Sequence, residues 1–210
     1  MRLLLEVTVT QERDVPGALE GGADRLLTTA TETAVVSATC REAGDVPVFV
    51  AVDSLETARP LLDVGAAGVA VGFLDEDLEV DVAACASLAE VPWLFTALDD
   101  TLDPRRSWRR LVGPPRLPGL VGVRSAGDPR GMGEGYDALL ATAESDPAVA
   151  ALLVPAGGLL AEHVPWLVRT GVRAFAVDAQ VRPGGSARAY VAADLVRSWR
   201  LLLDAAGERL

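Results

Sequence analysis

Residues 21–27 read GGADRLL, and the same arrangement returns as VGAAGVAV at 64–71 and as TGVRAFAV at 170–177. In each case a glycine follows a helix-like segment, and a short apolar run follows the glycine. Glycine adopts the left-handed backbone that ends many helices, and a run that is apolar on both faces is typical of a parallel strand covered by helices. The three segments therefore predict helices that alternate with parallel strands.

The same alternation extends along the whole chain. Eight apolar runs are predicted to form strands: 3–9, 25–28, 48–52, 68–71, 93–97, 120–123, 151–154 and 174–177. Eight segments between and after them are predicted to form helices: 14–20, 32–43, 54–64, 80–89, 103–111, 136–144, 159–170 and 189–206. Eight such units in 210 residues predict a short, compact (βα)8 barrel of the TIM type, a fold that begins at about 200 residues.

An open, doubly wound sheet is the main alternative to this barrel. Such sheets usually have fewer strands, and no GxGxxG motif follows the first predicted strand. No linker, charge block or low-complexity stretch divides the sequence, so residues 1–210 are expected to form a single domain.

Charge and hydropathy exclude several classes of partner. The chain has 30 acidic and 19 basic side chains, a net charge of −11, and all of its basic side chains are arginine. An acidic surface repels nucleic acid and anionic lipid, and no window approaches the ~18 consecutive apolar residues of a membrane helix. We expect no nucleic-acid partner and no membrane partner. The first residues read as a strand rather than a signal peptide, which favours a cytoplasmic location.

The side chains that carry covalent and metal chemistry are scarce. The absence of lysine excludes Schiff-base chemistry. His163 is the one histidine, and Cys40 and Cys85 lie far apart in the sequence with no CxxC motif. Copper(I) prefers clustered thiolate, thioether or imidazole ligands. We therefore expect no metal site, no cofactor and no disulfide.

Several segments resemble the CutC copper-homeostasis family, in the same order along the chain. LEVTV and ALEGGADRLL are similar to its first strand and first helix–strand turn, and GAAGVAVGFLDEDLEVDV and ALDDTLDP to its central segments. VPAGGL and TGVRAFAV are similar to its seventh and eighth strands. The resemblance implies a (βα)8 barrel and a role in copper homeostasis.

The chain departs from this family at the polar positions of the barrel mouth. Where the family has glutamate, histidine or arginine, this sequence has Leu27, Phe49, Phe95, Thr96 and Ala176. The polar and glycine positions that it keeps include Glu6, Asp99, Ser125, Gly157 and Gly158. What the resemblance implies is therefore chiefly fold and ancestry.

Three side chains are candidates for acid–base catalysis, because functional residues of such barrels lie near the C-terminal ends of the strands. Glu6 lies within the first strand, where an inward carboxylate needs a partner that Arg124 could supply. Asp99 follows the fifth strand, and His163 lies one turn into the helix after the seventh. Structural roles as helix caps or solvated charges are the alternative, so the sequence does not decide whether the protein is an enzyme.

Two glycine-rich loops give the strongest functional signal. Gly157 and Gly158 precede a helix, and Gly185 and Ser186 follow the eighth strand. Free N–H groups at such positions attract anions, and these barrels commonly hold phosphate after strands 7 and 8. The predicted ligand-binding residues are Arg124, Ser125, Gly157, Gly158, Arg182, Gly185 and Ser186, with a small anion as the partner.

Two functions remain open at the level of the sequence. One is a CutC-like barrel that keeps an anion-binding mouth and, from the resemblance, a role in copper homeostasis. The other is a degenerate TIM barrel without catalysis, an interaction or structural protein that self-associates, for example as a homodimer. A pocket with converging polar groups favours the first, and a mouth plugged by apolar side chains favours the second.

Overall fold

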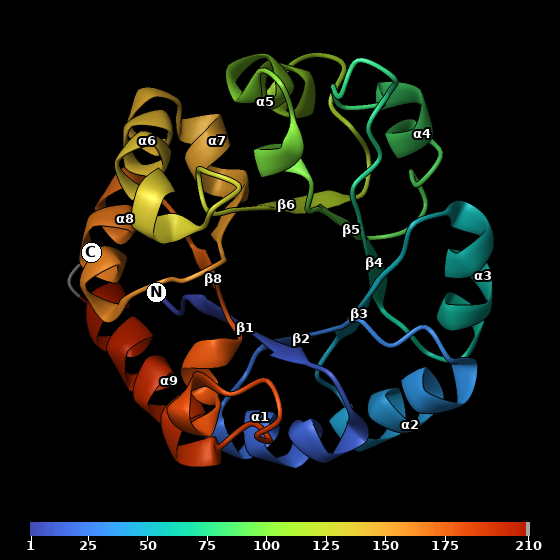
Figure 1. The fold of residues 1–210 in the computed structure, drawn as a ribbon, viewed down its shortest axis with the longest axis vertical. Coiled ribbons are helices and arrows are strands. Elements are labelled where there is room, and N and C mark those ends of the chain that lie inside the picture. Colours follow the sequence, from blue (N-terminus) through green and yellow to red (C-terminus); the bar gives the residue numbers. More distant parts are fainter. Residues whose placement is uncertain (209–210) are drawn as a thin grey trace.

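The computed structural model describes residues 1–208 and has eight parallel strands inside a ring of helices (Figure 1). The strands are β1 (Leu4–Val9), β2 (Arg25–Thr28), β3 (Val48–Ala51), β4 (Gly68–Val71), β5 (Trp93–Phe95), β6 (Leu120–Ser125), β7 (Leu153–Pro155) and β8 (Ala174–Val177). The helices are α1 (Val15–Gly21), α2 (Thr33–Ala43), α3 (Leu55–Asp63), α4 (Val82–Ala86), α5 (Pro104–Val112), α6 (Met132–Ser145), α7 (Pro147–Leu152), α8 (Val164–Thr170) and α9 (Ala193–Gly207). The predicted (βα)8 barrel of the TIM type is confirmed.

The strands pair in the order β7-β6-β5-β4-β3-β2-β1-β8, and every pair is parallel. β7 and β8 lie side by side and bring the ring nearly to closure, but within residues 1–208 no ladder of hydrogen bonds joins them. Between these two strands the inward side chains Ala174, Ala176, Val154 and Ala156 pack together. We call this boundary the β7–β8 seam.

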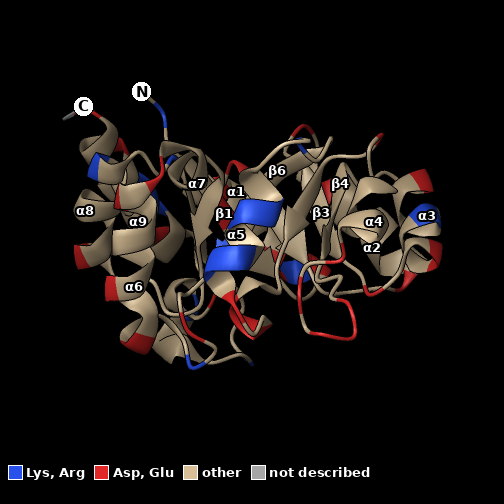
Figure 2. Cartoon of the chain, turned by 90° about the horizontal axis from the view of Figure 1, so that it is seen from above, with Lys and Arg blue, Asp and Glu red and all other residues tan. Residues whose placement is uncertain are grey.

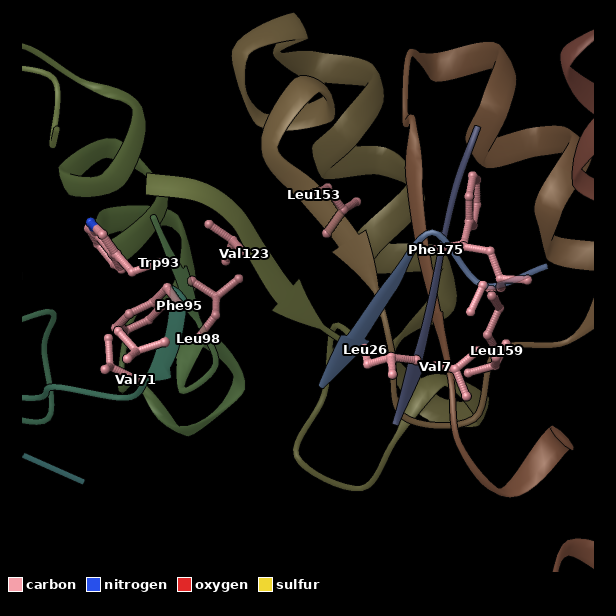
Figure 3. Close-up of a cluster of buried hydrophobic side chains, with 14 of the residues drawn as sticks. Val7, Leu26, Val71, Trp93, Phe95, Leu98, Val123, Leu153, Leu159 and Phe175 are labelled. Carbon is pink, nitrogen blue, oxygen red and sulfur yellow. The ribbon is translucent and has the colours of Figure 1, made fainter. Parts of the chain in front are cut away.

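The hydrophobic core has an outer and an inner part. The outer part lies between strands and helices and is the larger of the two; Figure 3 draws some of it, with Val71, Phe95 and Leu98 gathered beside Trp93. The inner part fills the barrel between β2 and β5 with Leu27, Phe49, Ala70 and Leu94. One side of the interior is therefore plugged by apolar side chains, which leaves the side near β1, β6, β7 and β8 for polar groups.

Most predicted elements are confirmed, and the predicted strands 25–28, 68–71 and 174–177 have the observed bounds. The predicted strand 151–154 is wrong in its first half, because Pro147–Leu152 forms α7. Asp146 caps this helix by accepting a hydrogen bond from the Ala148 N–H group, with Pro147 in the first turn. This Asp-Pro signal is typical of a helix start and could have predicted α7.

Two predicted helices begin four or five residues later than expected, a larger difference than at the other helix starts predicted too early. The predicted helix 159–170 opens as a 3-10 turn at Ala161–His163 before α8, and the predicted helix 189–206 begins only at Ala193. Both starts leave a longer loop at the C-terminal end of the barrel. Within residues 1–208, no helix is both long enough and apolar enough to cross a membrane.

Candidate functional site

An ion cluster lies inside the barrel around the carboxylate of Glu6, which is fully buried. Arg25 Nε donates a hydrogen bond to Glu6 Oε2 at 2.6 Å, and Arg124 Nε lies 3.3 Å from Glu6 Oε1. The guanidinium of Arg25 also lies over the Phe49 ring, 5.2 Å from its centroid. The expected pairing of Glu6 with Arg124 is therefore found, and Arg25 is a second partner that the sequence analysis missed.

This cluster has one negative and two positive side chains, so its net charge is +1. Three of its buried atoms have no hydrogen-bond partner within the described residues: Glu6 Oε1, Arg25 Nη2 and Arg124 Nε. Charges interact more strongly in the interior of a protein than in water. The cluster is therefore a local positive centre inside an acidic protein.

A pocket of about 420 Å³ opens beside this cluster, at the C-terminal end of the β7–β8 seam. It is lined by Arg124, Gly157, Gly158, Leu159, Leu160, Ala176, Val177, Asp178, Ala179 and Gln180. Its size falls within the range of about 300–1,000 Å³ that is typical of small-molecule sites. The arrangement brings together three of the predicted ligand-binding residues, Arg124, Gly157 and Gly158.

The loop after β7 lines this pocket with residues whose backbone N–H groups have no acceptor within residues 1–208. Gly157 and Gly158 have φ angles of +75° and +99°, which residues with a side chain rarely adopt. The N–H groups of Gly157, Gly158 and Leu159 donate no hydrogen bond to any acceptor in the part of the chain that the structure describes. These residues line the same pocket as Arg124, so N–H groups without an acceptor belong to the same wall as this arginine.

The side chain of Gln180 holds this loop against the loop after β8. Its Nε2 donates to the Leu159 carbonyl oxygen at 2.9 Å, and its Oε1 accepts from the Asp178 N–H group at 3.0 Å. Both ends of the amide are thereby used to fix the pocket wall. The position of Gln180 just after the eighth predicted strand was the only signal for it in the sequence.

Arg182 does not reach the pocket, contrary to the expected role. Its side chain is 1% exposed and donates to both carboxylate oxygens of Asp14, at 3.2 and 3.0 Å. It also donates to the Thr8 and Ala189 carbonyl oxygens and to Asp178. These bonds occupy its donors, and Arg182 is not among the residues that line the pocket.

Asp14 is fully buried and is the centre of this second ion pair. Burial alone would raise the pKa of its carboxyl, but hydrogen bonds from Arg182 and from the Thr10 and Val191 N–H groups together outweigh burial and lower the pKa below its ordinary value. The pair ties the start of α1 to the loop after β8. It therefore stabilises the loop after β8, whose first residues line the pocket.

Three more predicted ligand-binding residues lie outside the pocket. The N–H groups of Gly185 and Ser186 donate to the Arg182 and Pro183 carbonyl oxygens within a tight turn. Ser125 donates its hydroxyl hydrogen to Asp99 and is almost fully buried. The polar groups named here form hydrogen bonds within the protein, and none of the three residues lines the pocket with Arg124.

Asp99, a predicted catalytic residue, connects the ends of β5 and β6. Its carboxylate accepts hydrogen bonds from the Ser125 hydroxyl and from the Ala126 and Gly127 N–H groups. It also borders a larger groove of about 670 Å³ between α5, α6 and α7, outside the barrel. This groove is larger than the pocket at the seam, but Arg124, Gly157 and Gly158 do not line it.

His163, the third predicted catalytic residue, lies at the start of α8 and is almost fully buried. Its Nδ1 accepts a hydrogen bond from the Leu160 N–H group, and its ring stacks on Tyr136 with centroids 4.0 Å apart. Burial lowers the pKa of the imidazole. The ring packs against Tyr136 of α6, and His163 is not among the residues that line the pocket.

The two cysteines are placed as packing residues. Cys85 is buried in α4, and burial together with the nearby Asp81 charge raises the pKa of its thiol to about 12. Cys40 lies on α2, and burial raises its pKa as well. Among the described residues, no three His, Cys, Asp or Glu side chains come together in a way that could hold a metal ion.

Comparisons with known proteins support the fold and nothing finer. No family model matches the chain, and no curated protein matches it. Among solved structures, a thiamine phosphate pyrophosphorylase from Pyrococcus furiosus is similar over 97% of this chain and 96% of its own, with a TM-score of 0.66 and 20% identity. A putative copper homeostasis protein CutC from Streptococcus agalactiae is similar over 83% and 97%, with a TM-score of 0.64 and 16% identity.

A 3-hexulose-6-phosphate synthase is also similar, over 95% of this chain and 99% of its own, with a TM-score of 0.65 and 15% identity. The likeness to CutC is therefore no greater than the likeness to other TIM barrels. At these identities the chain is shown to share the TIM-barrel fold with all three proteins.

Proposed function

We propose that the protein binds a small anionic ligand in the pocket at the β7–β8 seam. The observation that carries this proposal is Arg124, which belongs to a cluster of net charge +1 and lines the same pocket as three residues whose N–H groups have no acceptor in residues 1–208. Arginine and backbone N–H groups are common donors to carboxylates and phosphates. The ligand would bridge Arg124 and the loop after β7.

The overall charge of −11 opposes the approach of an anion, but it acts at long range. Figure 2 shows Asp and Glu spread over the outer helices and loops. Salt screens exposed charges beyond about 8–10 Å, whereas a partly buried guanidinium acts directly on a group in contact with it. The local cluster therefore decides whether an anion binds, and we expect weak, roughly millimolar affinity for a minimal anion.

A role in copper homeostasis, implied by resemblance, receives less support from the site. The donors that gather at the mouth are guanidinium and N–H groups, which repel or cannot ligate a metal cation. Two of the similar barrels have phosphate compounds in their names, but their likeness to this chain concerns the fold alone. The proposal thus depends on the pocket itself.

Calorimetry and amide chemical-shift titration with inorganic phosphate, sulfate and acetate test the proposal. We expect at least one anion to bind the native protein and to shift the Gly157 and Gly158 amides, and Arg124→Gln to abolish that response. Arg25 still neutralises Glu6 in this variant, so the fold should survive. Arg105→Gln, an exposed arginine on α5, is the matched control and should leave binding unchanged.

If no anion binds the native protein at tens of millimolar, the anion site does not exist. The alternative of a degenerate barrel that acts as an interaction or structural protein then takes its place. A homodimer, if it forms, would appear in sedimentation velocity as a concentration-dependent mass.

A further inference from the structure

We infer that the ligand of this pocket is a small monocarboxylate with an apolar body. This inference rests on the proposed anion site and specifies its ligand class. Three features carry it: the charge of the cluster, the number of donors left free on Arg124, and the apolar character of the remaining wall.

The charge of the cluster matches one negative charge. Glu6 already neutralises one of the two arginines, through the 2.6 Å hydrogen bond from Arg25, so a single excess positive charge remains. A carboxylate would bring the cluster to neutrality. A phosphate dianion would leave a net negative charge next to the buried Glu6, and unbalanced charge is costly in the interior.

The free donors of Arg124 also suit a small head group. Its Nε faces Glu6, and its Nη2 lies 3.5 Å from the Thr8 hydroxyl oxygen, which leaves Nη1 without a partner in the described residues. Together with the unbonded N–H groups of Gly157, Gly158 and Leu159, Nη1 leaves enough donors for both oxygens of a carboxylate.

The rest of the pocket is apolar and borders the seam. Leu159, Leu160, Ala176, Val177 and Ala179 line it, and among residues 1–208 the one other charged lining residue is Asp178. The Asp178 side chain is 56% exposed and already lies 3.3 Å from Arg182, so it adds negative charge at the rim. This wall would bury a hydrocarbon chain and would repel a second anionic group at the far end of the ligand.

Calorimetric titration with acetate, propionate, butyrate, pentanoate and hexanoate, and with inorganic phosphate at about pH 8, tests the ligand class. Each added methylene should raise the affinity about fourfold until the pocket is full, which is the ratio for about 0.8 kcal/mol per buried CH2. Arg124→Gln should abolish binding of the whole series. Leu160→Ser should weaken the dependence on chain length, because Leu160 is a half-exposed part of the apolar pocket wall.

Other results would contradict the ligand class, and one of them would also contradict the anion site. If phosphate binds through Arg124 more tightly than every carboxylate, the ligand class is wrong and the anion site stands. If carboxylates bind equally well to Arg124→Gln, or if chain length has no effect, the inference is also overturned. If neither carboxylates nor phosphate bind, both the inference and the proposed function fall.

Discussion

Asp14 and Arg182 form a buried ion pair between residues that lie 168 positions apart in the chain. Two charges inside a protein are tolerated only when each finds its partner, and removal of one partner leaves the other charge uncompensated. Arg124 differs because Glu6 has a second arginine partner in Arg25. Of these two arginines, we therefore expect Arg182 to matter for stability and Arg124 to matter for ligand binding.

Arg182→Ala should lower the free energy of unfolding by about 3–5 kcal/mol, since it leaves the Asp14 carboxylate buried without its counter-charge. Urea denaturation near neutral pH measures the change. Arg197→Ala, which removes an exposed pair with Glu20, is the control and should cost about 0–1 kcal/mol. Equal effects of the two substitutions would contradict the role given to Arg182.

The contribution of the Asp14–Arg182 ion pair to the free energy of unfolding depends on pH. Because the pKa of Asp14 is lowered in the folded protein, its contribution is complete above the ordinary aspartate pKa of about 3.9 and is lost as the pH falls through the lowered value. The stability difference between the native protein and Arg182→Ala should therefore shrink in acid.

His163 should make stability depend on pH in a higher range. Burial lowers its pKa in the folded state, so below about pH 6.5 the unfolded chain binds a proton that the folded protein does not. Stability should fall from about pH 7 to pH 5 with a slope of at most about 1.4 kcal/mol per pH unit. Denaturation curves of His163→Gln should lack this slope, and an unchanged slope would show that other groups cause it.

At the scale of elements, glycines set how closely helices approach one another. A Cβ atom at Gly21 in α1 would lie 2.3 Å from the Val196 Cβ atom of α9, which is far inside contact distance. By contrast, a Cβ atom at Gly133 in α6 would meet nothing within 4 Å. The first glycine is required by packing between helices, whereas the second is open to replacement.

Gly21→Ala should destabilise the protein by about 1–3 kcal/mol through overpacking at the α1–α9 contact. Gly133→Ala should stabilise it by about 0.5–1 kcal/mol, because alanine loses less backbone entropy in a helix. Thermal denaturation of the two variants side by side measures both effects. A stable Gly21→Ala variant would mean that α9 can shift away from α1 at little cost.

At the scale of the whole molecule, the β7–β8 seam is the place where the ring of strands is not joined by hydrogen bonds within residues 1–208. Every other strand is hydrogen-bonded to two neighbours, whereas β7 and β8 are each bonded to one within the described residues. Backbone groups that face the seam have weaker protection against opening. Because the pocket lies at the end of the seam, a bound ligand would join the loops that follow the two strands.

Hydrogen exchange followed by mass spectrometry should find faster exchange in peptides that contain β7 and β8 than in peptides that contain β3 and β4. Opening of the seam breaks fewer hydrogen bonds than opening of the ring elsewhere. A saturating anion should slow exchange at β7 and β8 and leave β3 and β4 unchanged. Uniform protection around the ring would show that the seam is closed in solution.

The sequence by itself determined the class of fold, because apolar runs, glycine stops and helix caps are local signals that act over a few residues. It also indicated that Glu6 needs a partner and that Gly157 and Gly158 lie at the barrel mouth, because parallel strands bring their C-terminal ends to one end of the barrel. Single-domain organisation remains a prediction from the lack of a linker.

Only the tertiary structure decided which charged residue meets which. Arg124 and Arg182 both follow or end strands near the same mouth, but one turns toward Glu6 and the pocket while the other turns toward Asp14. Asp99 and Ser125 satisfy each other, and His163 is held by a helix start. These choices depend on side-chain directions and on contacts between distant parts of the chain, and the free energy of an ion pair or hydrogen bond depends on a geometry that local patterns do not encode.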